Sequence, residues 1–443
     1  MSITDKQHSP SQQLQHSKGP LTTEWSWIPT AYFADGFPFV SAMILSVVMY
    51  KQMGLSNDHI TFMAAWLYLP WVLKPFWEPM LRQLLSYRWW FLISQFLICL
   101  SFLSLALAVP SIVWRQASFC GFLMVAFSSA LHGNSVRGLF DRWVLEEHRS
   151  MLKILRNLFF MLAVILTQGF LLMVAGNLQV IYRNSITYSW SLLFYLLCGL
   201  ALLLWLWHCI TLPRSKRRHS GHFSSLVPID EIHSGLNSLM SSRWSIASLL
   251  FTLFYFVPLA LLSKTTNLFL IDAAHNGGLG LSPQEYGLAQ GSAGVFGLIV
   301  GLTAGHYLIS RDGLHRWLLP MALVTALSGG IYIYFSKILP DNLLVIIFLV
   351  FCYQLCAGFG CSAYFHFINY FTGNGSRSHH NWSEALIAFS QMIAVMISGT
   401  LEYSMGYTEF FTLALYCGFG TILVALLVRI TVMRRSTSFR NSR

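Results

Sequence analysis

Long apolar runs alternate with short polar segments along almost the whole chain. A helix rises 1.5 Å per residue, so about 20 apolar residues cross the hydrocarbon core of a bilayer. The pattern predicts an all-α membrane protein with twelve transmembrane helices, near residues 26–50, 59–83, 88–110, 113–136, 151–175, 187–210, 244–272, 283–309, 315–336, 342–371, 381–403 and 408–433.

The largest polar interruption divides these spans into six plus six. We expect five parts: a disordered cytoplasmic tail, a first six-helix half, a basic cytoplasmic linker, a second six-helix half and a basic cytoplasmic tail. They cover residues 1–25, 26–210, 211–243, 244–433 and 434–443. The first tail has no charged start followed by a short apolar run and a small-residue cleavage site, so it is not expected to be a signal peptide.

A short repeat supports the division into related halves. The sequence Met-Gly-Leu-Ser at 53–56 follows the first predicted span, and Leu-Gly-Leu-Ser at 279–282 follows the seventh. Both serines are placed to cap the next helix, and Glu285 completes a capping-box pattern with Ser282. Two parallel six-helix halves are the design of transporters whose substrate site lies between the halves near mid-membrane.

Composition excludes a water-soluble fold. Of 443 residues, 55% are hydrophobic and 10% are charged, whereas about a quarter of the residues of a soluble domain are charged. The eight cysteines are scattered through apolar stretches, without the spacing of a disulfide framework or a zinc site. We therefore expect no metal and no cofactor.

The formal net charge of +11 is explained by membrane orientation. In a soluble chain it would suggest nucleic-acid binding. Here Lys and Arg concentrate in the tails, the linker and the loops on one side of the predicted topology, and the other side has only Lys51, Arg115, Arg183, Lys264 and Lys337. By the positive-inside rule both termini are cytoplasmic. No nucleic-acid partner is expected.

Asp35 is the first candidate for a functional role. It lies about ten residues into the first span, roughly 15 Å deep, where an unpaired charge costs several kcal/mol. Gly36 and Pro38 loosen the helix there, which is tolerable beside a cavity or a packed neighbour. We expect Asp35 to face a cavity or to carry protons; the alternative is a carboxylate satisfied by a neighbouring helix.

Lys74 and Glu78 lie one helical turn apart in the second span and are able to pair. As the one basic residue placed inside a span, Lys74 could bind an anionic substrate or compensate Asp35. Alternatively, its long stem carries the ammonium group toward lipid headgroups. Glu78, closer to the surface, is better explained as structural.

Other polar residues inside spans are weaker candidates. His132, His306 and His366 could titrate during a proton-driven cycle, although most such histidines are merely hydrogen-bonded. Gln168 and Gln391 are plausible hydrogen-bond partners for a substrate.

A glycine stripe in the eighth span predicts close helix packing. Its members recur every three or four residues, a spacing that lets a second helix approach closely. A phosphate-binding loop would need a preceding strand, and none is indicated. The stripe comprises Gly287, Gly291, Gly294, Gly297, Gly301 and Gly305.

The second span carries the most specific resemblance to a known family. Residues 68–81 read YLPWVLKPFWEPML. This segment resembles the second span of the AmpG-like muropeptide permeases of the major facilitator superfamily, which reads Leu-Pro-Tyr-x-x-Lys-x-x-Trp-Ala-Pro-Leu. The first span has a similar Gly-x-Pro turn, and Gly-Leu-Gly-Leu-Ser before span eight looks like members from Bacteroides-type bacteria.

The resemblance implies proton-coupled import of a cell-wall fragment or another bulky polar solute through the bacterial inner membrane. We expect the protein to be a monomer. The resemblance assigns Lys74 and Trp77 to the family motif, with Trp77 at the helix break. Two positions depart from the pattern: Glu78 replaces a small residue, and Arg82 stands where the family has the acidic residue of its cytoplasmic gate.

A secondary active transporter working by alternating access is therefore the leading hypothesis. A membrane enzyme such as a cell-envelope acyltransferase is the alternative from another class, and it would depend on loop groups such as Asp141 and His148. A third possibility is a non-transporting sensor on a transporter fold.

Overall fold

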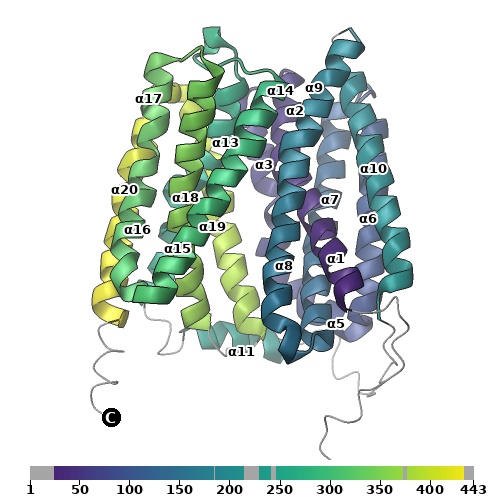
Figure 1. Cartoon of the computed structure of the whole chain (residues 1–443), viewed down its shortest axis with the longest axis vertical. Coiled ribbons are helices and arrows are strands. Elements are labelled where there is room, and N and C mark those ends of the chain that lie inside the picture. The colour runs from purple at the N-terminus through teal and green to yellow at the C-terminus, as the bar shows by residue number, and fades with distance from the viewer. Residues whose placement is uncertain (1–23, 184, 214–228, 241–245, 373–376, 434–443) are drawn as a thin grey trace, which may run out of the picture.

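The computed structural model describes residues 24–183, 185–213, 229–240, 246–372 and 377–433. Within these ranges the chain forms two helical bundles side by side, α1 to α10 in one and α12 to α20 in the other (Figure 1). Helix α11 (Ile229–Met240) lies across one end of the molecule, at the bottom of the view. We call this end the linker face and the other end the opposite face.

The first bundle, the N-terminal half, contains the first six predicted spans. Its helices are α1 (Glu24–Val40), α2 (Ser46–Gln52), α3 (Asn57–Trp66), α4 (Leu69–Val72), α5 (Lys74–Leu84), α6 (Tyr87–Ala108), α7 (Trp114–Trp143), α8 (Glu146–Val164), α9 (Leu171–Ile181) and α10 (Ile186–Thr211). Two π-helices interrupt long spans, η2 (Ser41–Leu45) between α1 and α2 and η3 (Ile165–Phe170) between α8 and α9.

The second bundle, the C-terminal half, contains the other six. Its helices are α12 (Ile246–Phe254), α13 (Val257–Ile271), α14 (Pro283–Tyr286), α15 (Val295–Asp312), α16 (Leu314–Ser328), α17 (Gly330–Ile338), α18 (Leu343–Thr372), α19 (Arg377–Met405) and α20 (Tyr407–Val428). The 3₁₀ turn η4 (Ala274–Asn276) follows α13, the π-helix η5 (Gly287–Gly294) joins α14 to α15, and the π-helix η6 (Arg429–Met433) follows α20.

Eleven helical segments of the described chain are long and apolar enough to cross a membrane. The remaining predicted span, near 59–83, is divided into α3, α4 and α5. Its breaks precede Pro70 and Pro75, which lack the N–H that would continue the helix. The Trp77 indole donates to the carbonyl oxygen of Pro70 at 2.8 Å, so this side chain stabilises the broken segment.

The internal repeat has a structural basis in both halves. Gly54 and Gly280 adopt positive φ angles of 84° and 66°, a conformation that a Cβ disfavours. The predicted capping box after the second copy is confirmed, because Ser282 and Glu285 exchange side-chain to backbone hydrogen bonds. Ser56 is the N-cap residue of α3, but its hydroxyl group bonds the His59 ring and not the helix backbone.

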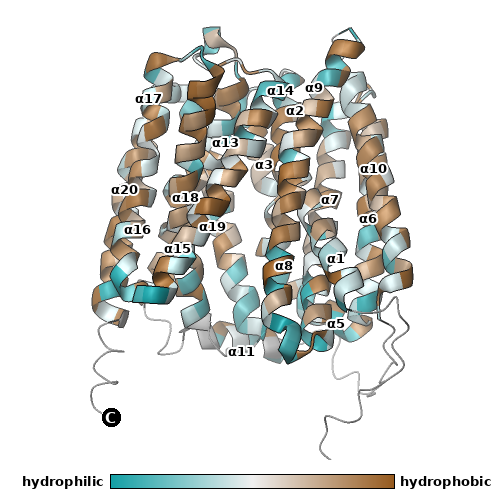
Figure 2. Ribbon diagram, in the orientation of Figure 1, coloured by the Kyte–Doolittle hydropathy of each residue, from teal (hydrophilic) through white to brown (hydrophobic). Residues whose placement is uncertain are grey.

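Apolar side chains cover the mid-height of the helices, and hydrophilic residues gather at the linker face, as Figure 2 shows. Leu203, Phe419 and Leu423 are more than 60% exposed on the outer surface. This distribution suits a chain whose outer surface contacts lipid.

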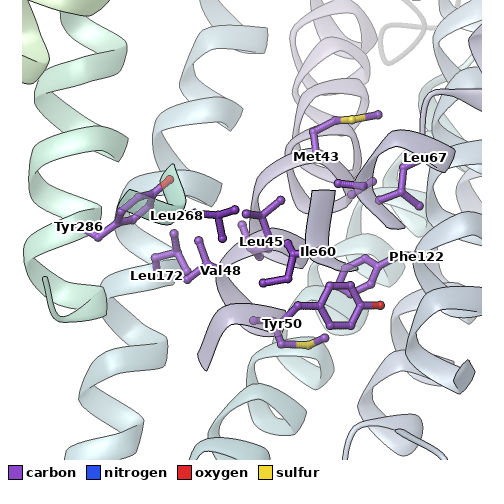
Figure 3. Close-up of a cluster of buried hydrophobic side chains, with 14 of the residues drawn as sticks. Met43, Leu45, Val48, Tyr50, Ile60, Leu67, Phe122, Leu172, Leu268 and Tyr286 are labelled. Atoms are coloured by element: carbon purple, nitrogen blue, oxygen red, sulfur yellow. The ribbon is translucent and has the colours of Figure 1, made fainter. Parts of the chain in front are cut away.

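The largest buried cluster joins the two halves. Figure 3 shows Val48 and Leu172 of the N-terminal half beside Leu268 and Tyr286 of the C-terminal half. All four are at most 2% exposed. The halves are therefore packed together on the side of the cluster, toward the opposite face.

Candidate functional site

A large cavity at the interface of the halves has a volume of about 950 Å³. It brings together three sequence candidates, Asp35 from α1, His306 from α15 and His366 from α18. Its lining includes exposed residues of α8 and α15, and these two helices separate toward the linker face (Figure 1). Besides the three candidates, its polar lining includes Tyr32, Ser129, Arg137, Arg156, Asn157, Thr303, Ser362 and Asn369.

Asp35 lies against α7. Its Oδ1 is 3.7 Å from Nδ1 of His132, which is fully buried, and both His132 ring nitrogens lack a hydrogen-bond partner within the described residues. A Cβ at Gly133 would lie 2.7 Å from the same Asp35 oxygen, so glycine is what lets the carboxylate approach α7. The Asp35 side chain keeps 21% of its surface exposed to the cavity.

Gly36 allows α1 to pack closely against α8 beside this carboxylate. A Cβ at Gly36 would come within 2.8 Å of the Ala163 Cβ on α8. Pro38 lies inside α1, just before η2. The helix remains continuous at both positions, so neither residue ends it.

His306 and His366 form a stacked pair on adjacent helices of the C-terminal half. Their ring centroids are 4.9 Å apart, and Nδ1 of His306 lies 2.8 Å from Nε2 of His366. The hydrogen bond requires a proton on one of the two facing nitrogens.

The sequence suggests that Lys74 pairs with Glu78 or compensates Asp35, but its ion-pair partner is a third carboxylate. Its Nζ lies 2.5 Å from Oε2 of Glu384 on α19, in the other half. Arg137 of α7 forms a second ion pair with the same carboxylate. Lys74 is 2% exposed, so neither snorkelling to lipid headgroups nor open binding of an anion describes it. Lys74 is the first residue of α5, directly after the break at Leu73, and its ion pair joins this end of α5 to α19.

Glu78 forms a second link between the same two spans. It is fully buried, accepts a hydrogen bond of 2.9 Å from Asn381 and lies 3.3 Å from Nε of Arg377. Both partners belong to α19. The expected structural role of Glu78 therefore takes the form of a contact between the halves.

Sequence reasoning missed Glu384, although a signal was present. The residue lies within the predicted span 381–403, where any ionisable side chain is a candidate. Arg137 was assigned to a loop, because the predicted span ended at residue 136 whereas α7 continues to Trp143.

Lys264 also departs from its expected place on the outer side. It lies inside α13, is 2% exposed and donates to the carbonyl oxygen of Met43 in η2 at 2.7 Å. Its Nζ is 5.6 Å from the ring centroid of Tyr68. Lys74 is therefore not the one basic residue inside a span, and Lys264 joins the two halves at mid-helix.

A smaller cavity of about 340 Å³ holds the other two candidates. Gln168 of η3 and Gln391 of α19 line it from opposite halves, together with Gln290, Gln354 and Asn267. Phe365 lines both cavities, so the two spaces are neighbours.

Polar contacts close the opposite face. Lys51 donates to Asp272 at 2.7 Å, and Asn57 donates to Glu402 at 2.8 Å, so each pair joins the N-terminal half to the C-terminal half. Burial would raise the pKa of Asp272, but hydrogen bonds from Lys51, Asn276 and Tyr407 outweigh it and hold this pKa below its usual range. We call these five groups the opposite-face latch: Lys51, Asn57, Asp272, Glu402 and Tyr407.

The glycines of the predicted stripe face two different neighbours. Gly297 and Gly301 lie against α18, where an added Cβ would be 2.5 Å from the Phe351 oxygen and 2.2 Å from the Leu355 oxygen. Gly294 also faces α18, through Val350 at 3.2 Å. Gly291 instead faces η3 of the other half, where a Cβ would be 2.2 Å from the Gln168 oxygen.

The geometry of two bundles around a central cavity agrees with a family match. A family model described as "Major Facilitator Superfamily" matches residues 30–381. The chain belongs to the Major Facilitator Superfamily. It has the superfamily's multi-pass transporter fold, and this membership does not distinguish the AmpG-like branch from others.

Solved structures of transporters share the fold. The nucleoside transporter NupG superposes with a TM-score of 0.64 at 13% identity, covering 93% of this chain and 100% of that one. A POT family transporter in complex with 5-aminolevulinic acid gives 0.66 at 11% identity, covering 94% and 98%. Among curated proteins no relative matches the chain. At such identities these neighbours establish the fold of this superfamily member and not its substrate.

The loop groups considered for an enzyme have other partners. Asp141 lies 3.3 Å from Arg149, and Nδ1 of His148 lies 2.9 Å from Glu24. Each of these groups has an ion-pair partner of its own, and superfamily membership favours a transporter.

Proposed function

We propose that this chain is a secondary active transporter that moves a bulky polar solute by alternating access, with protons as the coupling ion. The observation that carries the proposal is the cavity of about 950 Å³ between the halves, which contains a carboxylate and two histidines. A charged side chain at this depth is costly unless it serves a pathway or a partner.

The unequal closure of the two faces supports alternating access. Toward the opposite face, η3 packs on η5 and α9 packs on α14. The latch joins α2 to the end of α13 and α3 to α19. Toward the linker face, α8 and α15 separate while Glu384 still holds α19 to the N-terminal half (Figure 1). In this proposal the solute leaves the large cavity between α8 and α15.

Proton coupling is assigned to Asp35 with His132, and the His306–His366 pair is a second candidate. A carboxylate that faces a cavity and lies 3.7 Å from a buried imidazole can exchange its proton with water and with that ring. A change in its charge would alter the field at Arg137, which shares the cavity lining. Arg137 in turn holds Glu384 across the interface.

The proposed orientation and substrate rest on the sequence. The excess of Lys and Arg in the linker and the loops on its side supports a cytoplasmic linker face. The family resemblance supports a location in a bacterial inner membrane, where we propose that the protein acts as a monomer. The resemblance in the second span favours import of a muropeptide-like cell-wall fragment or a solute of similar size and polarity. Trp77 would act there as a support of the broken span.

Uptake into proteoliposomes tests this function. We would offer labelled muropeptides, short peptides, nucleosides and sugars with and without a pH gradient, and we expect at least one solute to accumulate only with the gradient. Asp35→Asn should abolish accumulation and retain exchange of solute, because it removes the titrating group only. The exposed carboxylate Asp141 provides the control Asp141→Asn, which should behave as wild type. Accumulation of no solute, or normal gradient-driven uptake by folded Asp35→Asn, would contradict the proposal.

A further inference from the structure

Three π-helices contribute to the wall of the smaller cavity, which we call the carboxamide chamber. Ile44 belongs to η2, Gln168 to η3 and Gln290 to η5, and all three line the chamber. A π-helix widens the backbone and redirects its side chains, and such segments occur frequently at functional sites. The three spans that carry them come from both halves, so the chamber lies at their interface.

The described polar lining of the chamber carries no charged side chain. It consists of five carboxamides, two hydroxyl groups of Ser and Thr, two phenols and a thiol: Gln168, Asn267, Gln290, Gln354, Gln391, Ser263, Thr266, Tyr68, Tyr353 and Cys361. Each carboxamide offers both a hydrogen-bond donor and an acceptor. Such a lining suits an uncharged polar group and disfavours an ion, because no residue of the lining supplies a counter-charge.

One of these carboxamides has an unused acceptor. Gln290 is 4% exposed, and its Oε1 has no hydrogen-bond partner within the described residues. A buried acceptor without a donor costs free energy, so it marks a place where a donor from outside the chain can bind. By contrast, Asn267 already accepts from Tyr286 at 2.8 Å and donates to Ser263 at 2.8 Å.

The neighbouring large cavity has the opposite character. Arg137, Arg156, His306 and His366 line it, with Asp35 as the one carboxylate of that lining. Arg137 is engaged by Glu384, whereas the guanidinium of Arg156 lies over the Tyr32 ring at 5.5 Å and donates to the neutral Asn157 side chain at 3.3 Å. A negatively charged group in this cavity can therefore pair with Arg156.

We propose that the carboxamide chamber recognises an uncharged N–H-bearing amide or imide group of the solute, while the anionic part of the same solute lies in the large cavity near Arg156. The inference rests on the proposed transport function and names its substrate class. The N–H group donates to Gln290 Oε1, and the carbonyl oxygen accepts from the carboxamide N–H of Gln168, Gln354 or Gln391. The volume of about 340 Å³ accommodates a ring or an acylamino group, since a water molecule in the liquid occupies about 30 Å³.

Binding to the purified full-length protein in detergent tests the inference with two matched series of probes. The imide series is uridine 5′-monophosphate, its N3-methyl derivative, uridine and ribose 5-phosphate. The acylamino series is N-acetylglucosamine 1-phosphate, glucose 1-phosphate and N-acetylglucosamine. In at least one series the probe with both N–H group and phosphate should bind at least tenfold more tightly than each probe that lacks one of them.

The variant Gln290→Leu assigns the effect to the chamber. It should weaken the complete probe about tenfold and leave ribose 5-phosphate or glucose 1-phosphate unchanged. Gln284→Leu is the matched control, because Gln284 lies on α14 outside the chamber and contacts Asn177. The melting temperature of each variant establishes that it is folded.

Two results would overturn the inference: no advantage of the complete probe in either series, or an equal response of wild type and folded Gln290→Leu to every probe. Both would leave the transport function intact if the proteoliposomes still accumulate a solute under a pH gradient. Absence of all transport together with selective binding in the chamber would instead retain the subsite and reject the transporter.

Discussion

At the residue scale, Glu384 is the carboxylate on which two cations of the other half depend. Lys74 and Arg137 both pair with it. The Lys74 side chain is buried, whereas Glu384 and Arg137 keep 32% and 42% of their side chains exposed. Replacing Glu384 leaves the buried Lys74 ammonium without its carboxylate, and an unpaired buried charge is destabilising. We expect Glu384→Gln to lower the melting temperature, and Glu384→Gln with Lys74→Gln to recover part of the loss. An unchanged melting temperature in the single variant would show that this triad does not stabilise the interface.

The latch residue Asp272 should give a pH-dependent effect of definite sign. Its pKa is depressed below the ordinary 3.8 by Lys51, Asn276 and Tyr407. A depressed carboxyl pKa contributes stability above the ordinary value, and this contribution is lost as pH falls through the depressed one. Asp272→Asn should therefore lower the melting temperature at pH 7 and converge with wild type in strong acid. A difference of equal size at both pH values would exclude the ionised carboxylate as the cause.

At the element scale, two glycines on one span should have separable effects. Gly291 faces η3 of the other half, whereas Gly301 faces α18 of its own half. Because a Cβ would lie 2.2 Å from a backbone oxygen in each case, Gly291→Ala should force the halves apart on the opposite face and Gly301→Ala should destabilise the C-terminal bundle. Spin labels at Arg183 and His275, in a background with the exposed Cys120 replaced by Ser, measure the separation.

The label distance should lengthen in Gly291→Ala and stay constant in Gly301→Ala, while the melting temperature should fall mainly in Gly301→Ala. Equal changes in both variants would mean that the glycine stripe has one function along its length.

The sequence predicts elements better than it predicts partners. Apolar runs indicate the spans, because bilayer thickness acts locally, whereas the breaks before Pro70 and Pro75 inside the predicted span 59–83 are not expected from this pattern. Asp35, His306 and His366 could be proposed for a cavity by the same local rule. The partner of Lys74 could not, since Glu384 lies 310 residues away and reaches it only after the halves pack.

At the scale of the whole molecule, the two faces of the interface are closed by different chemistry. At the opposite face the interface is held by the latch and by backbone contacts at Gly169 and Gly291. At the linker face one side is held by the ion pairs of Glu384 with Lys74 and Arg137. The solute cavity lies between these closures. A cycle that exposes the cavity alternately must weaken one closure as it completes the other.

Paired distance measurements test this central claim most directly. One spin-label pair, Arg183 with His275, spans the opposite face, and a second pair, Lys153 with Arg316, spans the linker face. We would record both in wild type and in Asp272→Asn with Glu402→Gln, which removes both latch carboxylates. Loss of about 1–3 kcal/mol of latch energy shifts the equilibrium between the two access states by roughly five- to 140-fold. If the two closures alternate, the distance on the opposite face lengthens while the distance on the linker face shortens, and two distances that stay fixed or lengthen together would contradict this claim.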